Sequence, residues 1–238
     1  MLTVSLGIDV EPDCPPYLAT QYRGVCEGLP KLLDLLDEME VPVTCFCTGD
    51  VAQRYPDSIT EIARRGHEVG CHGHTHRPFD TLSAADAEWE IAASTRVLRA
   101  LVEDLTSFRA PNLRFPNAFL PMLEANGFRA DSSQAKYKAA YYARPARTTL
   151  RRIPASMTSS VLRLDAWLRD PWLSALSSPV VLFVHPWEFV DLTRERLRLD
   201  CRFRTGEPAL RALREVITLF RARGAAFARL RDLEGPAA

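Results

Sequence analysis

The sequence predicts an α/β fold in a single domain, a parallel sheet whose strands alternate with crossover helices. Three observations support this class. Short apolar runs alternate with amphipathic segments along almost the whole chain of 238 residues. Among these residues we find no internal repeat, low-complexity linker or break in composition. The apolar fraction of 47% and the charged fraction of 25% are ordinary for a globular chain. We therefore expect one domain over residues 1–238, with seven or eight strands.

The first half of the chain alternates strand and helix in order. Pro30 suits the first turn of a helix, where its missing N–H is harmless, and Gly66 suits a helix end. Ser83 and Asp86 resemble a capping box. The expected elements are a strand at 3–9, a helix from Gly28 through Met39, a strand at 42–47 closed by Thr48-Gly49-Asp50, a helix capped by Asp57 or Ser58 and reaching Arg65, a strand at 67–71, and a helix from Ser83 to about Val102.

The second half continues the alternation with one gap. A clear apolar run and an amphipathic segment follow the gap. The expected elements are a strand at 105–109, a helix at 118–126 stopped by Gly127, strands at 128–131 and 178–184, a helix at 208–223 and a final strand at 225–229. Residues 132–178 show no clear period, and no element is expected there.

Composition narrows the class of function and the compartment. A formal net charge of zero removes the main argument for nucleic acid as a partner. The start of the chain lacks the pattern of a secretory signal, and no stretch approaches the about 18 to 20 apolar residues that span a bilayer. The six cysteines form no CxxC pair, which suits a compartment where thiols stay reduced. We expect a cytoplasmic protein, with contact to a membrane surface as an option.

Histidine is concentrated in one stretch, residues 66–76, which holds four of the five histidines. His72 and His76 stand four apart, so a helical turn or a tight loop can aim both rings at one point. Imidazole is the commonest neutral metal ligand near pH 7. His67 and His74 are not expected to be ligands. Two imidazoles supply only half of a tetrahedral shell, so a carboxylate is needed from elsewhere.

Polar residues mark the ends of four expected strands. In parallel α/β folds, functional groups gather where strands pass into the following loops. The residues at these positions are Asp9 and Glu11, His72 and His76, Arg109, and His185. Each is ambiguous alone, and their common location in the fold predicts a single site.

The chemistry of these residues suggests a division of roles. Two histidines and one carboxylate leave open positions on a divalent metal, and Glu11 is the candidate third ligand. Asp9, two residues earlier on an extended segment, points to the same side and is the candidate general base. His185 is placed to donate a proton to a leaving amine. Arg109 is expected to form a bidentate pair with Asp9.

With these residues in place, the chain resembles the polysaccharide deacetylases of carbohydrate esterase family 4. The family's acidic motif is similar to Ile8-Asp9-Val10-Glu11, in its spaced variant, and its histidine motif to His72-Gly73-His74-Thr75-His76. The third motif resembles Phe108-Arg109-Ala110-Pro111-Asn112. The fifth resembles Leu182-Phe183-Val184-His185-Pro186-Trp187-Glu188-Phe189. The motifs occur in the family's order, over nearly the whole chain.

The resemblance implies a distorted (β/α)₇ barrel and a divalent metal, commonly zinc. It also implies hydrolysis of an N-acyl group on a sugar. By the same resemblance Asp9 is the base, His185 is the acid, and the metal ligands are Glu11, His72 and His76. It implies no organic cofactor.

Two positions depart from the family pattern. Glu11 stands where an aspartate is usual, which adds one methylene between backbone and metal and leaves Asp13 as a competing ligand. Gln134 stands where many members have the acid that tunes the catalytic histidine. Asp131 and Asp165 are both candidates to replace that acid, and the sequence does not choose between them.

Within the family, the stretch 23–30 is similar to deformylases that act on an undecaprenyl-phosphate-linked formamido-arabinose. Those relatives belong to the cytoplasmic subgroup with the spaced acidic motif. Residues 137–176 carry several aromatic residues among arginines, which suits a sugar, a phosphate or a lipid carrier as well as simple barrel packing.

The sequence therefore predicts a metal-dependent hydrolase that releases acetate or formate from an amino sugar, free or linked to a lipid or nucleotide. Two alternatives stay open. One is an amide or ureide hydrolase of the same barrel family that acts on a non-sugar substrate. The other is a carbohydrate-binding protein whose turnover is impaired by Glu11. The identity of the sugar, of the acyl group and of the physiological metal, and the oligomeric state, stay open at this point.

Overall fold

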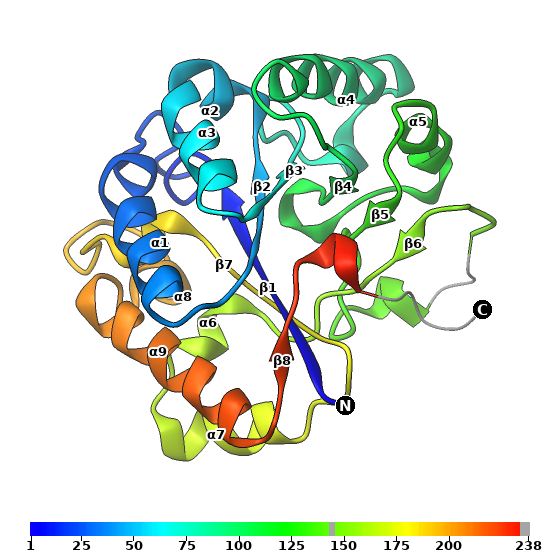
Figure 1. Ribbon diagram of the computed structural model, residues 1–238. Coiled ribbons are helices and arrows are strands. Elements are labelled where there is room, and N and C mark those ends of the chain that lie inside the picture. The colour runs from blue at the N-terminus through cyan, green and yellow to red at the C-terminus, as the bar shows by residue number, and fades with distance from the viewer. Residues whose placement is uncertain (143–145, 234–238) are drawn as a thin grey trace.

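A parallel sheet of eight strands forms the centre of the protein, in a computed structural model that describes residues 1–142 and 146–233 (Figure 1). The strands follow the order β6-β5-β4-β3-β2-β1-β7, and β8 pairs with β1. Their bounds are Thr3–Val10 (β1), Thr44–Cys47 (β2), Glu68–Cys71 (β3), Ser107–Phe108 (β4), Ala130–Asp131 (β5), Arg151–Arg152 (β6), Val180–Val184 (β7) and Ala226–Phe227 (β8). All these pairings are parallel, as the alternation of strand and helix predicts.

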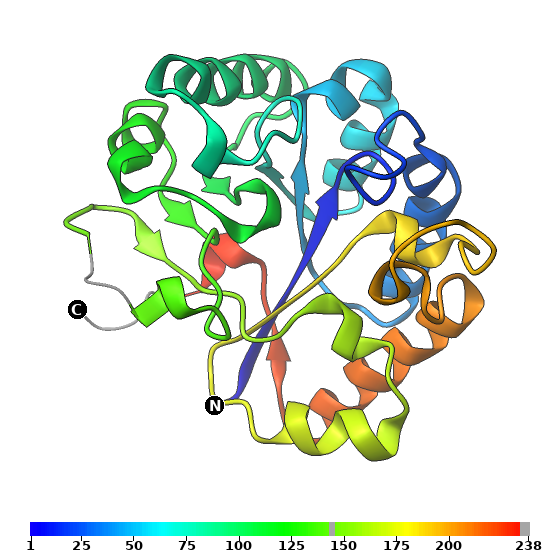
Figure 2. The ribbon, with the colours of Figure 1, turned by 180° about the vertical axis from the view of Figure 1, so that it is seen from behind.

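The sheet curls until its two edge strands approach each other. Backbone hydrogen bonding does not pair β6 with β7 directly, in the described part of the chain. Ser156, just after β6, closes the gap: its N–H donates to the Val181 carbonyl at 2.7 Å, and its hydroxyl accepts from the Val181 N–H at 3.0 Å. In Figure 2, β4 to β6 (green) lie to the left of β1 (blue), and β7 (yellow) crosses β1 and ends to its right. The expectation of a distorted α/β barrel is confirmed.

Helices surround this sheet (Figure 1). The α-helices are α1 (Leu29–Glu38), α2 (Gly49–Arg54), α3 (Pro56–Arg64), α4 (Ala84–Arg99), α5 (Leu120–Ala125), α6 (Ser159–Leu162), α7 (Ala166–Ser174), α8 (Leu199–Arg202) and α9 (Glu207–Ala222). The shorter turns are a π-helix, η1 (Gly24–Gly28), and six 3₁₀ turns, η2 (Phe79–Thr81), η3 (Pro111–Leu113), η4 (Asn117–Phe119), η5 (Ala139–Tyr142), η6 (Pro186–Phe189) and η7 (Leu230–Asp232). In the part of the chain that the structure describes, no helix is long and apolar enough to cross a membrane.

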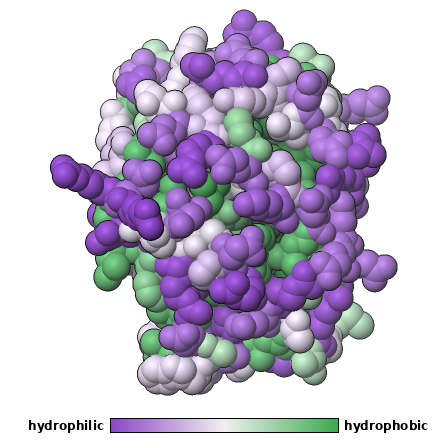
Figure 3. Space-filling view, turned by 90° about the vertical axis from the view of Figure 1, so that its left-hand side faces the viewer, coloured by the Kyte–Doolittle hydropathy of each residue, from purple (hydrophilic) through white to green (hydrophobic). Residues whose placement is uncertain are grey.

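The core lies on both faces of the central strand. β1 is buried from Val4 through Val10, because it is flanked by β2 and β7 and covered by helices. On the outside, α1 buries one stripe that includes Leu32 and Leu36. Figure 3, which views the left-hand side of Figure 1, shows a mostly hydrophilic surface, as amphipathic helices with outward polar faces should give.

One prediction in the first half is wrong because a helix was missed. β2 ends at Cys47, directly before Thr48-Gly49-Asp50 as predicted, but these residues begin the unpredicted helix α2: the Thr48 hydroxyl accepts from the Val51 N–H at 3.3 Å and caps it. The next helix then begins at Pro56, with Tyr55 at its N-cap, so neither Asp57 nor Ser58 is the cap. By contrast, the predicted Ser83 cap of α4 is confirmed, since its hydroxyl accepts from the Asp86 N–H at 3.1 Å.

Other differences concern the lengths of elements. The strands predicted at 105–109, 128–131 and 225–229 shrink to the two-residue strands β4, β5 and β8, and α4 ends at Arg99. Backbone contact continues past the short ladders, for example from the Arg129 N–H to the Thr106 carbonyl at 2.8 Å. The unassigned region 132–178 contains β6, α6 and α7. These elements are too short to show a clear hydrophobic period in the sequence.

Candidate active site

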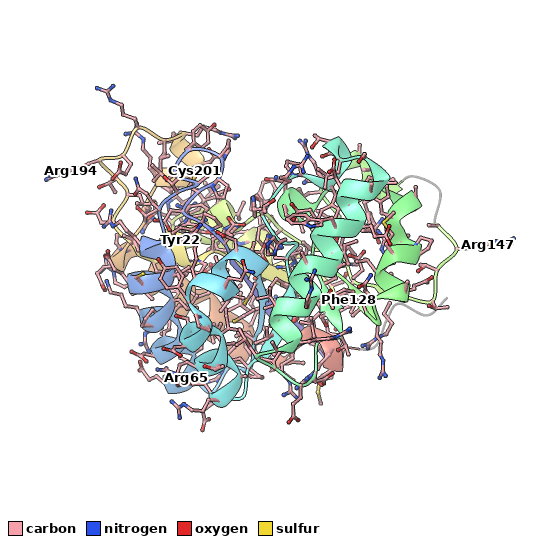
Figure 4. All side chains as sticks on the ribbon, turned by 90° about the horizontal axis from the view of Figure 1, so that it is seen from above. Tyr22, Arg65, Phe128, Arg147, Arg194 and Cys201 are labelled. Atoms are coloured by element: carbon pink, nitrogen blue, oxygen red, sulfur yellow. The ribbon has the colours of Figure 1, made fainter. Side chains whose placement is uncertain are left out.

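The carboxyl ends of β1, β3 and β7 open into one pocket of about 560 Å³. Five of the residues singled out from the sequence line it: Asp9, Glu11, His72, His76 and His185. The sixth, Arg109, follows β4 and lies fully buried beneath them. Other walls come from α6 and α8; Cys201 of α8 is labelled in Figure 4, on the side of the molecule away from Phe128.

Three of these side chains form a candidate metal centre. The donor atoms of Glu11, His72 and His76 all lie within 4.8 Å of one another. Glu11 Oε2 lies 2.6 Å from His76 Nε2 and 3.3 Å from His72 Nε2. The three side chains are almost completely shielded from solvent. Two imidazole nitrogens and one carboxylate oxygen are a donor set that divalent metals accept in catalytic sites.

A hydrogen bond fixes the tautomer of His72. Its Nδ1 lies 2.7 Å from the backbone carbonyl oxygen of Arg109, which can only accept. The proton is therefore on Nδ1, and the lone pair of Nε2 faces Glu11. This is the usual arrangement of a metal-bound histidine, whose second nitrogen donates to a carbonyl or carboxylate.

The charge state of Glu11 also suits a cation. Burial alone would raise the pKa of Glu11, but the positive charges of His76 and His185 and a hydrogen bond from His76 hold it well below its usual range. Burial correspondingly lowers the pKa of His76, and the charge of Glu11 more than reverses this and raises it. The cluster thus holds an ionised carboxylate, and the three residues fit a divalent metal.

Asp13, the competing ligand, is engaged elsewhere. Its Oδ1 accepts from the Gly24 N–H at 2.8 Å and its Oδ2 from the Arg23 N–H at 2.9 Å. Both oxygens therefore hold the start of η1. Glu11 is the carboxylate that the fold brings to the histidines.

Asp9 is held by a buried arginine. Arg109 Nη1 donates to Asp9 Oδ1 at 2.7 Å, while its Nη2 donates to Ser132 Oγ at 3.0 Å. The predicted bidentate pair is therefore wrong, because one arm of the guanidinium binds a neighbouring strand end. The guanidinium also lies over the Phe46 ring, 4.2 Å from its centroid. A Cβ on Gly7 would come within 2.4 Å of Nη1, so β1 needs a glycine there.

The imidazole ring of His185 faces the carboxylates of Asp9 and Glu11. Its Nε2 lies 4.0 Å from Asp9 Oδ2 and 3.9 Å from Glu11 Oε1. Its Nδ1 lies 2.7 Å from Glu188 Oε1. Burial alone would lower the pKa of His185, but the negative charges of Glu11, Glu188 and Asp9 outweigh burial and raise it to about 9. The ring is therefore protonated near neutral pH and able to give up a proton.

Glu188 is the acid that sequence reasoning missed. It is buried and forms an ion pair with Arg163 Nε at 2.8 Å. Neither candidate for this role reaches His185: Asp131 pairs with Arg152 at 2.6 Å, and Asp165 is an exposed partner of another arginine. The signal was present, because an acid three residues after His185 in one 3₁₀ turn returns to the same side.

Trp187 also has a role that its position alone did not reveal. Its indole N–H donates to Glu11 Oε1 at 3.1 Å, and its ring stacks on His185 with centroids 4.8 Å apart. It therefore fixes Oε1, the Glu11 oxygen that is not directed at His72 and His76. In the aromatic segment after Gln134, Tyr137 lines the pocket, whereas Trp167 and Trp172 are exposed on α7.

Comparisons with known proteins agree with this fold. The sequence model of the family described as "Polysaccharide deacetylase" matches residues 13–130. The peptidoglycan deacetylase of Helicobacter pylori is 30% identical over 144 residues, 56% of this chain and 49% of that protein. The chitooligosaccharide deacetylase of Sinorhizobium fredii is 34% identical over 70 residues, 29% of this chain and 33% of that protein. The matched region thus spans half or less of these curated relatives.

Solved structures match almost the whole chain. A family 4 carbohydrate esterase from Streptomyces lividans, in complex with acetate, has a TM-score of 0.65 at 16% identity, over 95% of this chain and 91% of that one. A family 4 pseudoenzyme from Bacillus anthracis has a TM-score of 0.64 at 18% identity, over 97% of this chain and 64% of that one. At these identities the likeness concerns the fold.

Proposed function

We propose that this chain is a member of the polysaccharide deacetylase family, to which its sequence and fold are similar, and that it is a metal-dependent hydrolase that removes an N-acyl group from an amino sugar. One observation carries the proposal. A carboxylate held by arginine, a Glu-His-His cluster and a protonated histidine converge in a single pocket. Each supplies one requirement of amide hydrolysis.

Glu11, His72 and His76 would hold the metal, with zinc as the first candidate. When bound, a divalent metal lowers the pKa of water and polarises the acyl carbonyl. The buried position of the three ligands keeps bulk water away from this point. Trp187 and the Arg109 carbonyl fix the orientation of two of the ligands.

Two side chains would move protons. Asp9, oriented by Arg109, accepts a proton from the attacking water as the new C–O bond forms. His185 donates its Nε2 proton to the amide nitrogen as the C–N bond breaks, so the products are a carboxylic acid and a free amine. Glu188 accepts from Nδ1 and keeps Nε2 pointed into the pocket.

The pocket suits a sugar derivative. Its walls include the aromatic rings of Tyr17, Tyr137 and Trp187 beside many polar groups, a combination that binds the faces and hydroxyls of sugar rings. Relatives named for peptidoglycan N-acetylglucosamine make N-acetylated glucosamine units the first substrates to test. The proposal extends to formyl as acyl group and to sugars on lipid or nucleotide carriers. We also propose that the protein acts in the cytoplasm, where its six cysteines stay reduced.

The test combines metal content with product release. Purified protein is analysed for bound metal and assayed for acetate and formate across N-acetyl and N-formyl amino sugars, free and carrier-linked, with a ureide and a cyclic imide included. We expect metal-dependent release from at least one sugar. Turnover of only the non-sugar amides would move the protein to another substrate class. A fully loaded metal site without any turnover would make it a carbohydrate-binding protein.

A further inference from the structure

A buried carboxylate outside the pocket holds the loop that carries both histidines. Glu90 lies in the middle of α4 and is fully buried. Its Oε2 accepts from the backbone N–H of His74 at 2.7 Å and of Thr75 at 2.8 Å. Its Oε1 accepts from the Thr75 hydroxyl. All three donors lie between His72 and His76, so one side chain binds the whole connection between the two ligands.

The backbone of this loop needs outside support. Gly73 has a φ of +74° and His76 a φ of +62°, both in the left-handed region. For a residue with a side chain, such as His76, this conformation is unfavourable by roughly 1–3 kcal/mol and persists only where neighbours enforce it. A Cβ at Gly73 would lie 3.2 Å from Phe79 and 3.5 Å from Glu90 Oε2, so the loop also packs closely against its surroundings.

The opposite side of the loop is held by α2, which packs beside α4 at the top of Figure 1. The N–H groups of Gly49 and Asp50 donate to the carbonyls of Gly73 and His74, each at 3.0 Å. The first turn of α2 therefore binds the loop carbonyls, and Glu90 binds the loop N–H groups. The two helices thus hold N–H and carbonyl groups of the loop from opposite sides.

The negative charge of Glu90 is also compensated by the loop. In the described residues, Glu90 forms no ion pair, because no Lys or Arg nitrogen lies within 4.0 Å of its carboxylate oxygens. Buried carboxylates normally have a cationic partner or hydrogen bonds to compensate for lost water. Here the compensation comes from the loop N–H groups, and a cation in the Glu11-His72-His76 cluster would add to it from beyond the loop.

We infer that Glu90 is a positioning residue of the metal site: it fixes the His72–His76 loop and raises the affinity of the cluster for a divalent cation. This inference rests on the proposed function, because it requires that the cluster binds metal. It assigns Glu90 no contact with substrate. Its effect is exerted through His76 and the loop backbone.

The decisive variant is Glu90→Gln. The amide oxygen can accept both backbone N–H groups and the amide N–H can donate to the Thr75 oxygen, so shape and hydrogen bonds are kept while the charge is lost. Glu88→Gln is the matched control, because Glu88 is exposed on the same helix. We measure the Zn²⁺ dissociation constant of each metal-free protein with a competing chromophoric chelator. Glu90→Gln should weaken Zn²⁺ by about 10- to 100-fold, the range usual for groups that support metal ligands. Glu88→Gln should bind as the parent does.

A second pair of variants tests the hydrogen bonds without touching the core. Thr75 is exposed, so Thr75→Val removes the hydroxyl at little risk to folding, and Thr75→Ser restores it. Thr75→Val should weaken Zn²⁺ and alter the visible spectrum of bound Co²⁺, and Thr75→Ser should restore both.

The outcomes separate the inference from the proposed function. A folded Glu90→Gln protein with parental Zn²⁺ affinity and Co²⁺ spectrum would overturn the role of Glu90 while the metal site stands. Parental behaviour of Thr75→Val would do the same if Glu90→Gln failed to fold. A parent protein that binds neither metal would remove the proposed metal site and, with it, this inference.

Discussion

The two ring nitrogens of His185 face different partners. Nδ1 contacts Glu188, and Nε2 is directed toward Asp9 and Glu11 at 3.9–4.0 Å. That separation is too long for a direct hydrogen bond, so Nε2 keeps its proton available for a group that enters the pocket. This geometry supports the proposal that His185 acts as a proton donor and not as a metal ligand.

His185→Ala tests this assignment. We expect the rate of deacylation to fall by about 10²- to 10⁴-fold, because a general acid contributes that much. Bound metal, measured by elemental analysis, should stay at the parental stoichiometry, whereas His76→Ala should lose both metal and activity. Loss of metal from His185→Ala would contradict the division between acid and ligands.

Glu188→Gln tests how the acid is tuned. Negative charge raises the pKa of His185 to about 9, and Glu188 is one of its sources. Removing that charge lowers this pKa, so His185 loses its proton at a lower pH. Activity should therefore decline earlier on the alkaline side of the pH-rate profile, while the acidic side is unchanged. A profile that keeps its alkaline limb would show that Glu188 only supports the fold.

Among the elements, β1 has a position, Gly7, that has no room for a side chain. It carries Asp9 at its carboxyl end and passes so close to Arg109 that only glycine fits at Gly7. The same arginine reaches Asp9 from β4. The strand therefore sets both the location of the candidate base and the room for the group that orients it.

Gly7→Ala should destabilise the protein and displace the arginine. Overpacking a full core is unfavourable by about 1–3 kcal/mol, which a urea titration can measure. Ser5→Ala, on the same strand, is the matched control, because the Ser5 hydroxyl is buried without a hydrogen-bond partner in the described structure. We expect that control to leave stability unchanged or raised. Equal effects of both substitutions would mean that Arg109 has room to move.

Sequence patterns predicted elements in proportion to their length. β1, α1, β7 and α9 are long enough to show a period, and each lies within a few residues of its expected place. α2 was missed because it is only six residues long and begins within the string Thr48-Gly49-Asp50, which is typical of a turn. β6 was missed because two arginines give no apolar signal, and backbone pairing with β5 alone makes the strand.

For the site, the sequence predicted the candidate catalytic and metal-binding residues better than the residues that hold them in place. The six candidate residues meet because each follows or ends a parallel strand, and that rule can be applied to a sequence; their roles remain predictions. Trp187 and Glu90 could not be assigned, because their contacts depend on side-chain orientation and helix packing that only coordinates give. Glu188 did have a sequence signal, its spacing of three residues from His185, but the predicted acids were Asp131 and Asp165. The left-handed φ of His76 has no sequence signal either.

At the scale of the whole molecule, the proposed metal joins distant parts of the chain. Glu11 follows β1, whereas His72 and His76 follow β3, and β2 lies between these strands. A ligand that binds the folded state alone stabilises it by RT ln(1 + [L]/Kd), about 2.7 kcal/mol when its concentration is 100 times Kd. For a chain of this size each kcal/mol raises Tm by about 2–4 °C. Saturating Zn²⁺ should therefore raise the Tm of the metal-free protein by about 5–11 °C, and a chelator should reverse the shift.

Ligand variants decide whether that shift comes from the candidate centre. His72→Ala and His76→Ala should remove it, and Glu11→Gln should reduce it strongly, because each takes one donor from a set of three. His67→Ala is the control: His67 lies on the other side of the fold, near Asp37, and its loss should leave the Zn²⁺-dependent shift intact. Differential scanning calorimetry at several Zn²⁺ concentrations gives each Tm. A shift that survived in His76→Ala but vanished in His67→Ala would place the metal away from the pocket, and the proposed chemistry would lose its centre.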